Sequence, residues 1–408
     1  MKIISKWLSL AVVLFPLLSV YSSIIPGVEF GTFLLLTVIF IIAIVRKKIE
    51  LKRLPVSVFG NYVLFASIVG YIFVCVCNYT TGVDATTVIF RIARFTLILF
   101  LFFSCGIYKY IDKDCLCKYL RIAVIGNAIF IIIQYIVFYF GIILTNPLLD
   151  FNFRGYSDFY IYLHRPSGFF LEPSHFAQYA IVYMIICFNL NRKNFFEICI
   201  TYAGVMMSTS GMGIVLANLL IIYYYVIKNK SNLRYPVLIL YSAFLLYFLQ
   251  SNNKLILMLY ERIFTAGGVY GGNAIDGRMG HGIDSFFNLP LLLKICGCGY
   301  GNEPMIYTGD SLFFYNGFTY TINTLGIVGL CAFIGLNIYY LFTTNALGRS
   351  LIVINLFFFF LDQNLTATNL VFIFGIIYSF SNNNNQLEFE KKRRIKFVFG
   401  KRRTKCLV

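Results

Sequence analysis

The chain has 408 residues, of which 59% are hydrophobic and only 12% are charged, and its mean hydropathy is +0.78. Soluble domains average about 25% charged residues, so this composition excludes a soluble globular protein. The net charge of +17 comes mainly from basic clusters in short linkers and in the C-terminal tail. That distribution follows the positive-inside pattern of membrane proteins and argues against a nucleic-acid-binding surface.

Apolar runs bounded by polar breaks follow one another along the chain, and many approach the roughly 20 residues that cross a bilayer as helix. They predict an all-α polytopic integral membrane protein with about twelve transmembrane helices and both termini in the cytoplasm. One transmembrane domain covers residues 1–380, and a basic cytoplasmic tail covers 381–408. The predicted spans are roughly 7–24, 28–45, 56–78, 88–108, 119–144, 175–190, 195–209, 211–227, 235–250, 316–342, 351–363 and 366–380.

The number of spans depends on two stretches, 195–227 and 351–380, that are long for one span and short for two. Each contains a polar break, which a short hairpin inside the bundle explains, because unwound backbone at membrane depth needs protein or water around it. If each were one long helix, the chain would have ten spans and residues 251–315 would be cytoplasmic. The density of three basic residues within 228–234 favours the twelve-span topology, with 251–315 outside.

Two long segments are then extracytoplasmic, about 146–174 and 251–315, and loops of this length are usually functional or disordered. The titratable residues of interest gather there. All three histidines and four arginines fall in these segments, and two more arginines lie at the outer end of the fourth predicted span: His164, His175, His281, Arg154, Arg165, Arg262, Arg278, Arg91 and Arg94. Arginine suits phosphate and carboxylate, so this set indicates an anionic ligand, and diphosphate is the obvious one at a membrane surface.

Simpler explanations compete with each of these residues. Arg91 and Arg94 also fit side chains that extend to lipid headgroups. Glu172, before Pro173, fits either a residue that stabilises a helix N-terminus, with Ser174 as the N-cap, or a general base beside His175. The sequence leaves these alternatives open.

Several kinds of site are disfavoured by the motifs. The C-x-C pairs lack the spacing of a zinc site, and the chain contains no P-loop, Rossmann, H-E-x-x-H or G-x-S-x-G pattern. We therefore expect no metal, no cofactor and no soluble nucleotide chemistry.

The chain resembles bacterial polysaccharide repeat-unit polymerases of the Wzy type, within the O-antigen polymerase and ligase superfamily. The resemblance covers nearly the whole chain through the pattern of spans. Its local matches are "RPSGFFLEPSHFAQY" at 165–179, "STSGMGIVLA" at 208–217, "GRMGHGIDSFFNLPLLLKICGCGYG" at 277–301 and "DSLFFYNGFTYTINTLGIVGL" at 310–330.

The resemblance implies a GT-C-like glycosyltransferase that moves a growing undecaprenyl-diphosphate-linked glycan onto a lipid-linked repeat unit at the outer face of the bacterial inner membrane. Arg165 and Arg278 match the family's functional arginines best, with Arg91 and Arg94 as further diphosphate ligands. Glu172, His281 and His175 are candidates for the base or for positioning the acceptor. The implied partners are the lipid-linked oligosaccharide, membrane lipid and, as a candidate, a chain-length regulator.

Two other functions remain as alternatives. O-antigen ligases tend to carry "H-N" where the second outer loop enters the next span, whereas this chain has Asp310 and Ser311 there. That difference favours a polymerase and adds Asp310 to the candidate site. A flippase for the lipid-linked glycan would be expected to carry charges along its mid-membrane path, and the predicted spans are nearly uncharged between their ends. We expect Arg165, Glu172 and His175 to lie opposite Arg278 and His281.

Overall fold

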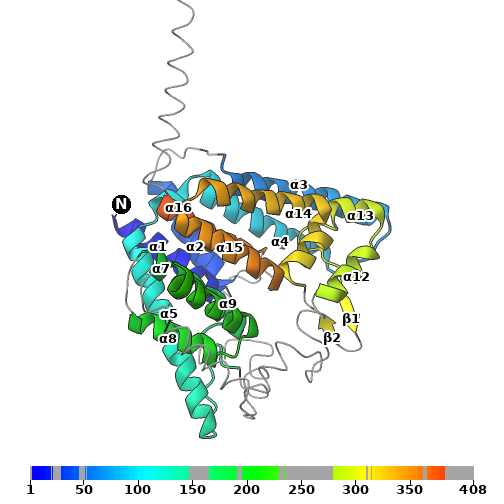
Figure 1. Cartoon of the computed structure of the whole chain (residues 1–408). Helices are drawn as coiled ribbons and strands as arrows, with labels where there is room; N and C mark the ends of the chain where they lie inside the picture. The colour runs from blue at the N-terminus through cyan, green and yellow to red at the C-terminus, as the bar shows by residue number, and fades with distance from the viewer. Residues whose placement is uncertain are drawn as a thin grey trace, which may run out of the picture.

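The computed structural model of the chain describes residues 2–19, 21, 29–45, 51, 53–146, 165–190, 195–228, 235, 279–308, 311–313, 315–361 and 365–381. This part of the chain is built almost entirely of helices (Figure 1). In chain order they are α1 (Lys2–Leu18), α2 (Phe30–Val45), α3 (Pro55–Val76), α4 (Ala85–Leu99), η1 (Phe100–Ser104), η2 (Ile107–Tyr110), α5 (Lys113–Tyr139), α7 (Pro173–Asn189), α8 (Phe195–Met207), α9 (Gly211–Ile221), η3 (Ile222–Lys228), α12 (His281–Phe287), α13 (Leu291–Cys296), α14 (Gly317–Thr343), α15 (Ala346–Leu361) and α16 (Ala367–Ser381).

Eleven of the twelve predicted spans coincide with these helices, and the remaining one, 235–250, lies almost wholly outside the described residues. Among the described residues, four helices are long and apolar enough to cross a membrane: α3, α4 continued by η1, α5 and α14. Six shorter apolar helices accompany them. The chain is therefore a helical, multi-pass membrane protein.

The two polar breaks that decided between ten and twelve spans both end helices. A turn at Ser208 and Thr209 separates α8 from α9, whereas α15 ends at Leu361 and α16 begins at Ala367. Ser210 caps α9, since its hydroxyl accepts a hydrogen bond from the amide of Gly213 at 3.3 Å. The prediction of two helices in each stretch is confirmed.

The described part of the second segment that was predicted to be extracytoplasmic contains regular structure. It contains two short helices, α12 and α13, separated by a turn that ends at Pro290. An antiparallel hairpin of two three-residue strands follows, β1 (Ile306–Thr308) and β2 (Ser311–Phe313), in which Tyr307 pairs with Leu312. Figure 1 shows α12, α13 and the hairpin together at one edge of the molecule, where α13 contacts both α3 and α14.

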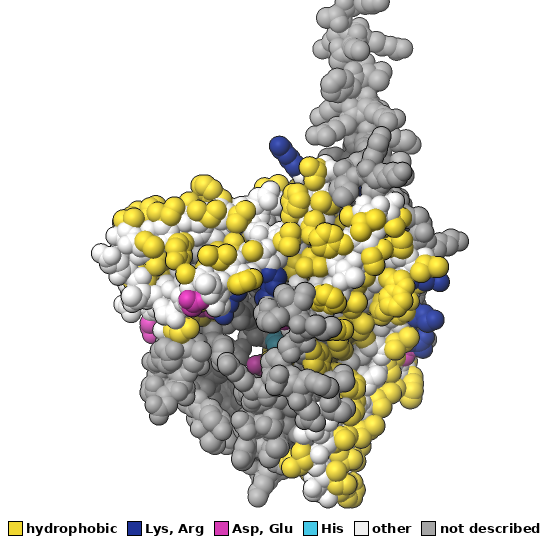
Figure 2. Space-filling model, turned by 180° about the vertical axis from the view of Figure 1, so that it is seen from behind, with side chains coloured by type: hydrophobic (Ala, Val, Ile, Leu, Met, Phe, Trp, Pro, Cys, Tyr) yellow, Lys and Arg dark blue, Asp and Glu magenta, His cyan; other side chains and the backbone are white. Residues whose placement is uncertain are grey.

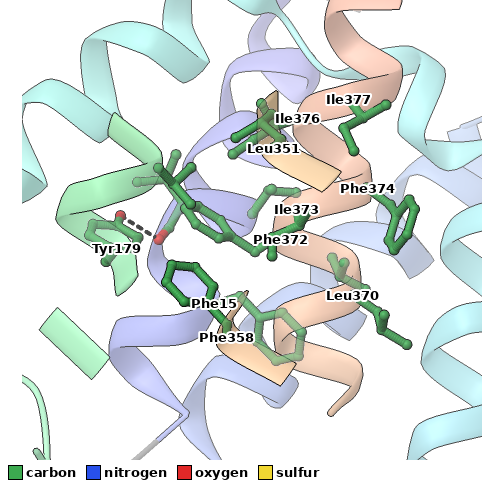
Figure 3. Close-up of a cluster of buried hydrophobic side chains, with 14 of the residues drawn as sticks. Phe15, Tyr179, Leu351, Phe358, Leu370, Phe372, Ile373, Phe374, Ile376 and Ile377 are labelled. Carbon is green, nitrogen blue, oxygen red and sulfur yellow. Dashed lines mark hydrogen bonds between the residues drawn. The ribbon is translucent and has the colours of Figure 1, made fainter. Parts of the chain in front are cut away.

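The core lies around α7 and α16, whose side chains are buried on nearly every side. Tyr179 of α7 stacks on Phe372 of α16 with ring centroids 5.0 Å apart, and its hydroxyl donates to the carbonyl oxygen of Val13 at 2.7 Å. Phe15 of α1 and Phe358 of α15 pack in the same cluster (Figure 3). A helix that is apolar all round belongs in the interior of a bundle, as both of these do.

Hydrogen bonds and ion pairs between helices sort the loops into two groups at opposite ends of the bundle. At one end, the Thr81 hydroxyl bonds the Asn302 side chain at 2.6 Å, and the Tyr300 hydroxyl bonds the carbonyl of Leu365 at 3.1 Å. At the other end, Arg121 of α5 pairs with Glu197 of α8. Residues 300–302, from the second segment that was predicted to be extracytoplasmic, therefore lie at the end away from Arg121 and Glu197.

Candidate functional site

Arg91 and Arg94 lie three residues apart on α4, so they project from one face of the helix. Each is held by a carboxylate from a different part of the chain. Arg91 Nη1 donates to Glu303 Oε1 and to the carbonyl oxygen of Gly301, both at 3.0 Å. Arg94 Nη1 is paired with Glu29, which immediately precedes α2. Two ion pairs thus stand side by side on one face of α4.

Tyr300 lies beneath these two ion pairs. Its ring packs on Phe95 with centroids 4.4 Å apart, and its hydroxyl donates to Leu365. Burial raises the pKa of Tyr300 well above its ordinary value, and this effect outweighs the nearby guanidiniums of Arg94 and Arg91, which lower the pKa. The phenol therefore stays neutral and forms the floor of the charged cluster.

The loop that carries Tyr300 and Glu303 is hydrogen-bonded to α14 at a point where this helix is broken. Gly326 has φ 67° and ψ −171° inside the helix, a conformation reserved for glycine, and the helical ladder is interrupted there. The carbonyls of Asn323 and Thr324, one turn earlier, accept hydrogen bonds from the amides of Cys298 at 2.9 Å and Gly299 at 2.8 Å. Buried backbone groups must be paired. The loop therefore supplies donors to the two carbonyls that the break releases, and these carbonyls supply acceptors to the loop.

Side chains fix the rest of this loop. The Ser67 hydroxyl of α3 accepts from the amide of Tyr300 at 3.1 Å, and the Tyr320 hydroxyl of α14 accepts from the amide of Gly301 at 3.0 Å. Asn302 is 1% exposed and donates to the carbonyl of Cys298 at 2.9 Å. The backbone that leads to Glu303 is therefore bonded to two neighbouring helices and is rigid.

Glu303 belongs to this cluster and was missed by the sequence reasoning. Its Oε1 atom is bonded to Arg91, whereas Oε2 is inaccessible to water and accepts no hydrogen bond from the described residues. Its position directly after the sequence "CGCGYGN" could have drawn attention to it, because glycines allow close backbone approach. The pairing with Arg91 crosses 212 positions and has no local signal.

The first predicted motif, residues 165–179, is anchored on α5. Gln134 and Asn127 of α5 accept the amide hydrogens of Gly168 and Phe169, each at 3.0 Å. The ring of Phe169 stacks on Phe130 with centroids 4.8 Å apart. Gly168 has φ 66°, and a Cβ atom there would lie 2.9 Å from Asn127 Oδ1, so glycine is required. Arg165 enters this anchored turn and is partly buried.

The predicted start of the following helix is corrected by two residues. Ser174 is not the N-cap: α7 begins at Pro173, so Glu172 is the N-cap, and proline is favoured at the first helical position. The Glu172 side chain makes no capping hydrogen bond; instead its Oε2 accepts from the Ser174 hydroxyl at 3.2 Å. Glu172 and His175 are both partly buried at this helix terminus.

His281 is the first residue of α12, and its neighbour Gly282 is fastened to α14. The Asn323 side chain donates to the carbonyl of Gly282 at 2.8 Å. A Cβ atom on Gly282 would lie 2.5 Å from Cβ of Thr319, so α12 approaches α14 closely at this point. These contacts fix the backbone position of His281.

Tyr21 links the first motif to the arginine cluster. Its hydroxyl donates to the carbonyl of Phe169 at 2.8 Å, and its own carbonyl accepts from the amide of Phe30, next to Glu29.

Figure 2 shows basic, acidic and histidine side chains gathered at a hollow between broad hydrophobic areas. Arg278 and Asp310 lie outside the described residues, so the expected juxtaposition of Arg165 with Arg278 stays a prediction.

Within the described ranges, no three histidine, cysteine, aspartate or glutamate side chains are grouped so as to hold a metal ion. The scan against protein-family models finds no match, and the searches of curated proteins and of solved structures also find none.

Proposed function

We propose that this protein is a polysaccharide polymerase of the bacterial inner membrane, with a GT-C-like arrangement of about twelve spans and both termini in the cytoplasm. It transfers the growing undecaprenyl-diphosphate-linked glycan onto the terminal sugar hydroxyl of a lipid-linked repeat unit at the outer face. The polymer is an O-antigen, a capsule or an exopolysaccharide. The proposal rests on the sequence resemblance to Wzy-type polymerases together with the site geometry.

The observation that carries the proposal is the state of the two guanidiniums on α4. Arg91 and Arg94 each use only Nη1 in their contacts with described residues, and their side chains are 41% and 37% exposed. An arginine has five N–H donors in a planar fork, so both retain donors in the geometry that a phosphate group accepts. The carboxylates of Glu303 and Glu29 orient these forks before a ligand binds.

The cluster suits transfer from a diphosphate carrier for an electrostatic reason. Negative charge grows on the diphosphate as the sugar–oxygen bond breaks, and preorganised guanidiniums stabilise that charge. Arg165 and Arg278 are proposed to complete the diphosphate site. Glu172, His281, His175 and Asp310 are proposed to position the acceptor or to take its proton. Lipid-facing helices on either side fit a substrate whose carrier stays in the bilayer.

The same chemistry also fits an O-antigen ligase, which uses the same donor with a different acceptor, so this remains the second candidate. A flippase is a third candidate, and it would carry ionisable groups between the ends of its spans. Arg94, which pairs with Glu29, is the tenth residue of the span Ala85–Ser104. The resemblance, and not the position of the ion pairs, therefore favours the polymerase.

The test is the length of the surface glycan in cells that lack the gene, complemented with wild type or variants. We expect Arg91→Gln and Arg94→Gln to reduce long-chain polymer by about 10-fold or more, since a hydrogen bond to a charged group contributes about 1.5–3 kcal/mol. Arg165→Ala and Arg278→Ala extend the test to the first motif and to the second outer segment.

Arg121→Gln is the matched control, because Arg121 is also paired with a glutamate but at the opposite end of the bundle. It should retain the polymer at equal protein abundance. Loss of even the single-repeat product in the deletion strain would identify a ligase or a flippase instead. An unchanged ladder in the deletion strain would refute the proposal.

A further inference from the structure

Glu303 has an oxygen atom whose environment is unusual for a folded protein. Its Oε2 is buried and receives no hydrogen bond from the part of the chain that the structure describes. Burying a carboxylate oxygen without a donor is unfavourable, so such atoms are few in native structures and each calls for an explanation. A bound hydroxyl group would satisfy this oxygen.

The neighbouring hydroxyl groups are already engaged elsewhere. The Tyr300 hydroxyl donates to the carbonyl of Leu365, and the Tyr315 hydroxyl donates to the carbonyl of Pro304 at 2.6 Å. The backbone that leads to Glu303 is bonded to α3 and α14, so it cannot shift to bring the carboxylate to another donor. The missing donor must therefore come from outside the described residues.

We infer that Glu303 is the general base of the transfer reaction, and that the donor its free oxygen lacks is the attacking hydroxyl of the acceptor sugar. This inference rests on the proposed function and deepens it. Glu303 takes the proton-accepting role for which the sequence offered Glu172, His175, His281 and Asp310, and leaves these residues to position the acceptor.

The step is balanced as follows. The acceptor hydroxyl gives its proton to Glu303 Oε2, and its oxygen forms a bond to the anomeric carbon of the donor glycan. The bond between that carbon and the diphosphate oxygen breaks, and the carrier diphosphate leaves with the electron pair. The proton then passes from Glu303 to water or to the released diphosphate.

The geometry around α4 allows Arg91 and Arg94 to have different roles in the reaction. Arg91 holds Oε1 of Glu303, which directs the other oxygen of the carboxylate away from Arg91. Residues three apart on a helix have Cβ atoms about 5–6 Å apart, so Arg94 projects one turn away. Arg94 can hold the diphosphate on one side of the sugar carbon while Glu303 meets the hydroxyl on the other side.

Access to the buried oxygen requires only a local movement. The Glu303 side chain as a whole is 21% exposed, although Oε2 itself is inaccessible. A half-turn of the terminal torsion only exchanges the two oxygens, so the movement is a change in the inner side-chain torsions that turns the whole carboxylate toward its exposed side. The acceptor hydroxyl can therefore reach an oxygen of this group.

The experiment uses the full-length protein in lipid nanodiscs, with the lipid-linked repeat units that accumulate in the deletion strain as the substrate. We expect Glu303→Gln to lower the polymerisation rate by about 10²–10⁴-fold, the usual range for loss of a general base, while binding of the lipid-linked repeat changes less than threefold. Glu303→Ala should be equally slow, and added formate should restore its rate at least tenfold, because a small carboxylate can occupy the vacated space.

A purely structural role would not respond to formate, so this readout separates the two explanations. Glu197→Gln is the matched control, since Glu197 is also bonded to an arginine but at the opposite end, and it should retain the wild-type rate. A Glu303→Gln rate within threefold of wild type overturns the inference, as does a Glu303→Ala variant that formate fails to restore. Wild-type protein that does not polymerise the repeat units overturns the proposed function as well.

Discussion

Replacing Gly326 by alanine tests whether the break in α14 sets up the candidate site. If the break persists, alanine must adopt φ 67° and ψ −171°, a conformation that costs about 1–3 kcal/mol for a residue with a side chain. Its Cβ atom would also lie 2.1 Å from the carbonyl oxygen of Ile295, far inside contact distance, and backbone atoms cannot yield as a flexible side chain does.

The alternative for the variant is a straight α14. The carbonyls of Asn323 and Thr324 would return to the helical ladder, and the amides of Cys298 and Gly299 would lose their acceptors. A buried donor left without a partner costs about 1–3 kcal/mol, so two of them cost about 2–6 kcal/mol. Whichever response the chain takes, we expect a loss of at least about 2 kcal/mol.

Gly335→Ala on the same helix is the control, because a Cβ atom at Gly335 meets nothing within 4 Å. That change should leave stability unchanged or raise it by about 0.5–1 kcal/mol, as alanine favours helix. Thermal unfolding of both purified variants in the same detergent measures the difference, and the surface-glycan ladder measures activity. Equal melting temperatures for Gly326→Ala and Gly335→Ala would refute this account of the break.

Three further changes probe the anchors around the site. Gln134→Leu removes the acceptor for the Gly168 amide, so exchange of the amide hydrogens over 165–172 should accelerate. The free energy of unfolding should fall by about 1–3 kcal/mol. Unchanged exchange would argue against an anchoring role for Gln134. Tyr183→Phe deletes a 2.6 Å hydrogen bond to the carboxylate of Glu197 and should cost about 1.5–3 kcal/mol while polymer length stays normal, because the pair lies at the opposite end from the arginine cluster. A shortened ladder would contradict that separation. At Asp84, hydrogen bonds from the Thr86 side chain and from backbone amides hold the pKa of the carboxyl below its ordinary value. The Asp84 carboxylate therefore stabilises the α4 N-terminus fully above the ordinary pKa, and this stabilisation is lost only as the pH falls through the lowered pKa. In the wild type, amide exchange in the first turn of α4, corrected for the intrinsic rate, should be the same at pH 5 and pH 7. In Asp84→Ala it should be faster at both pH values. Equal rates in the two proteins would exclude Asp84 as the N-cap of α4.

The helices could largely be predicted from the sequence, because membrane-spanning length and apolar composition are local properties of a run of residues. The helices α8 and α15 end at Met207 and Leu361, next to the polar stretches that were expected to end them, since polar side chains there favour termination over continuation. The start of α7 at Pro173 was also within reach of the sequence, through the preference for proline at the first helical position.

The break at Gly326 was not predictable in the same way. Residues 316–342 form one apolar run, and a glycine inside such a run is compatible with an unbroken helix. The conformation is decided by the backbone of Ile295 and by two amides of the following loop, which need the carbonyls that the break releases. Those partners come from another segment, so only the folded chain selects the kink.

Assembly of the charged cluster depends on tertiary structure even more strongly. The sequence placed Arg91 and Arg94 at the outer end of a span beginning at residue 88, but the helix begins at Ala85 and Arg94 is the tenth residue of the span Ala85–Ser104. The sequence did not determine that Glu303 meets Arg91 across 212 positions or that Glu29 meets Arg94 across 65. Ion pairs form wherever the packed helices bring opposite charges within a few ångströms, and that proximity is a property of the folded bundle.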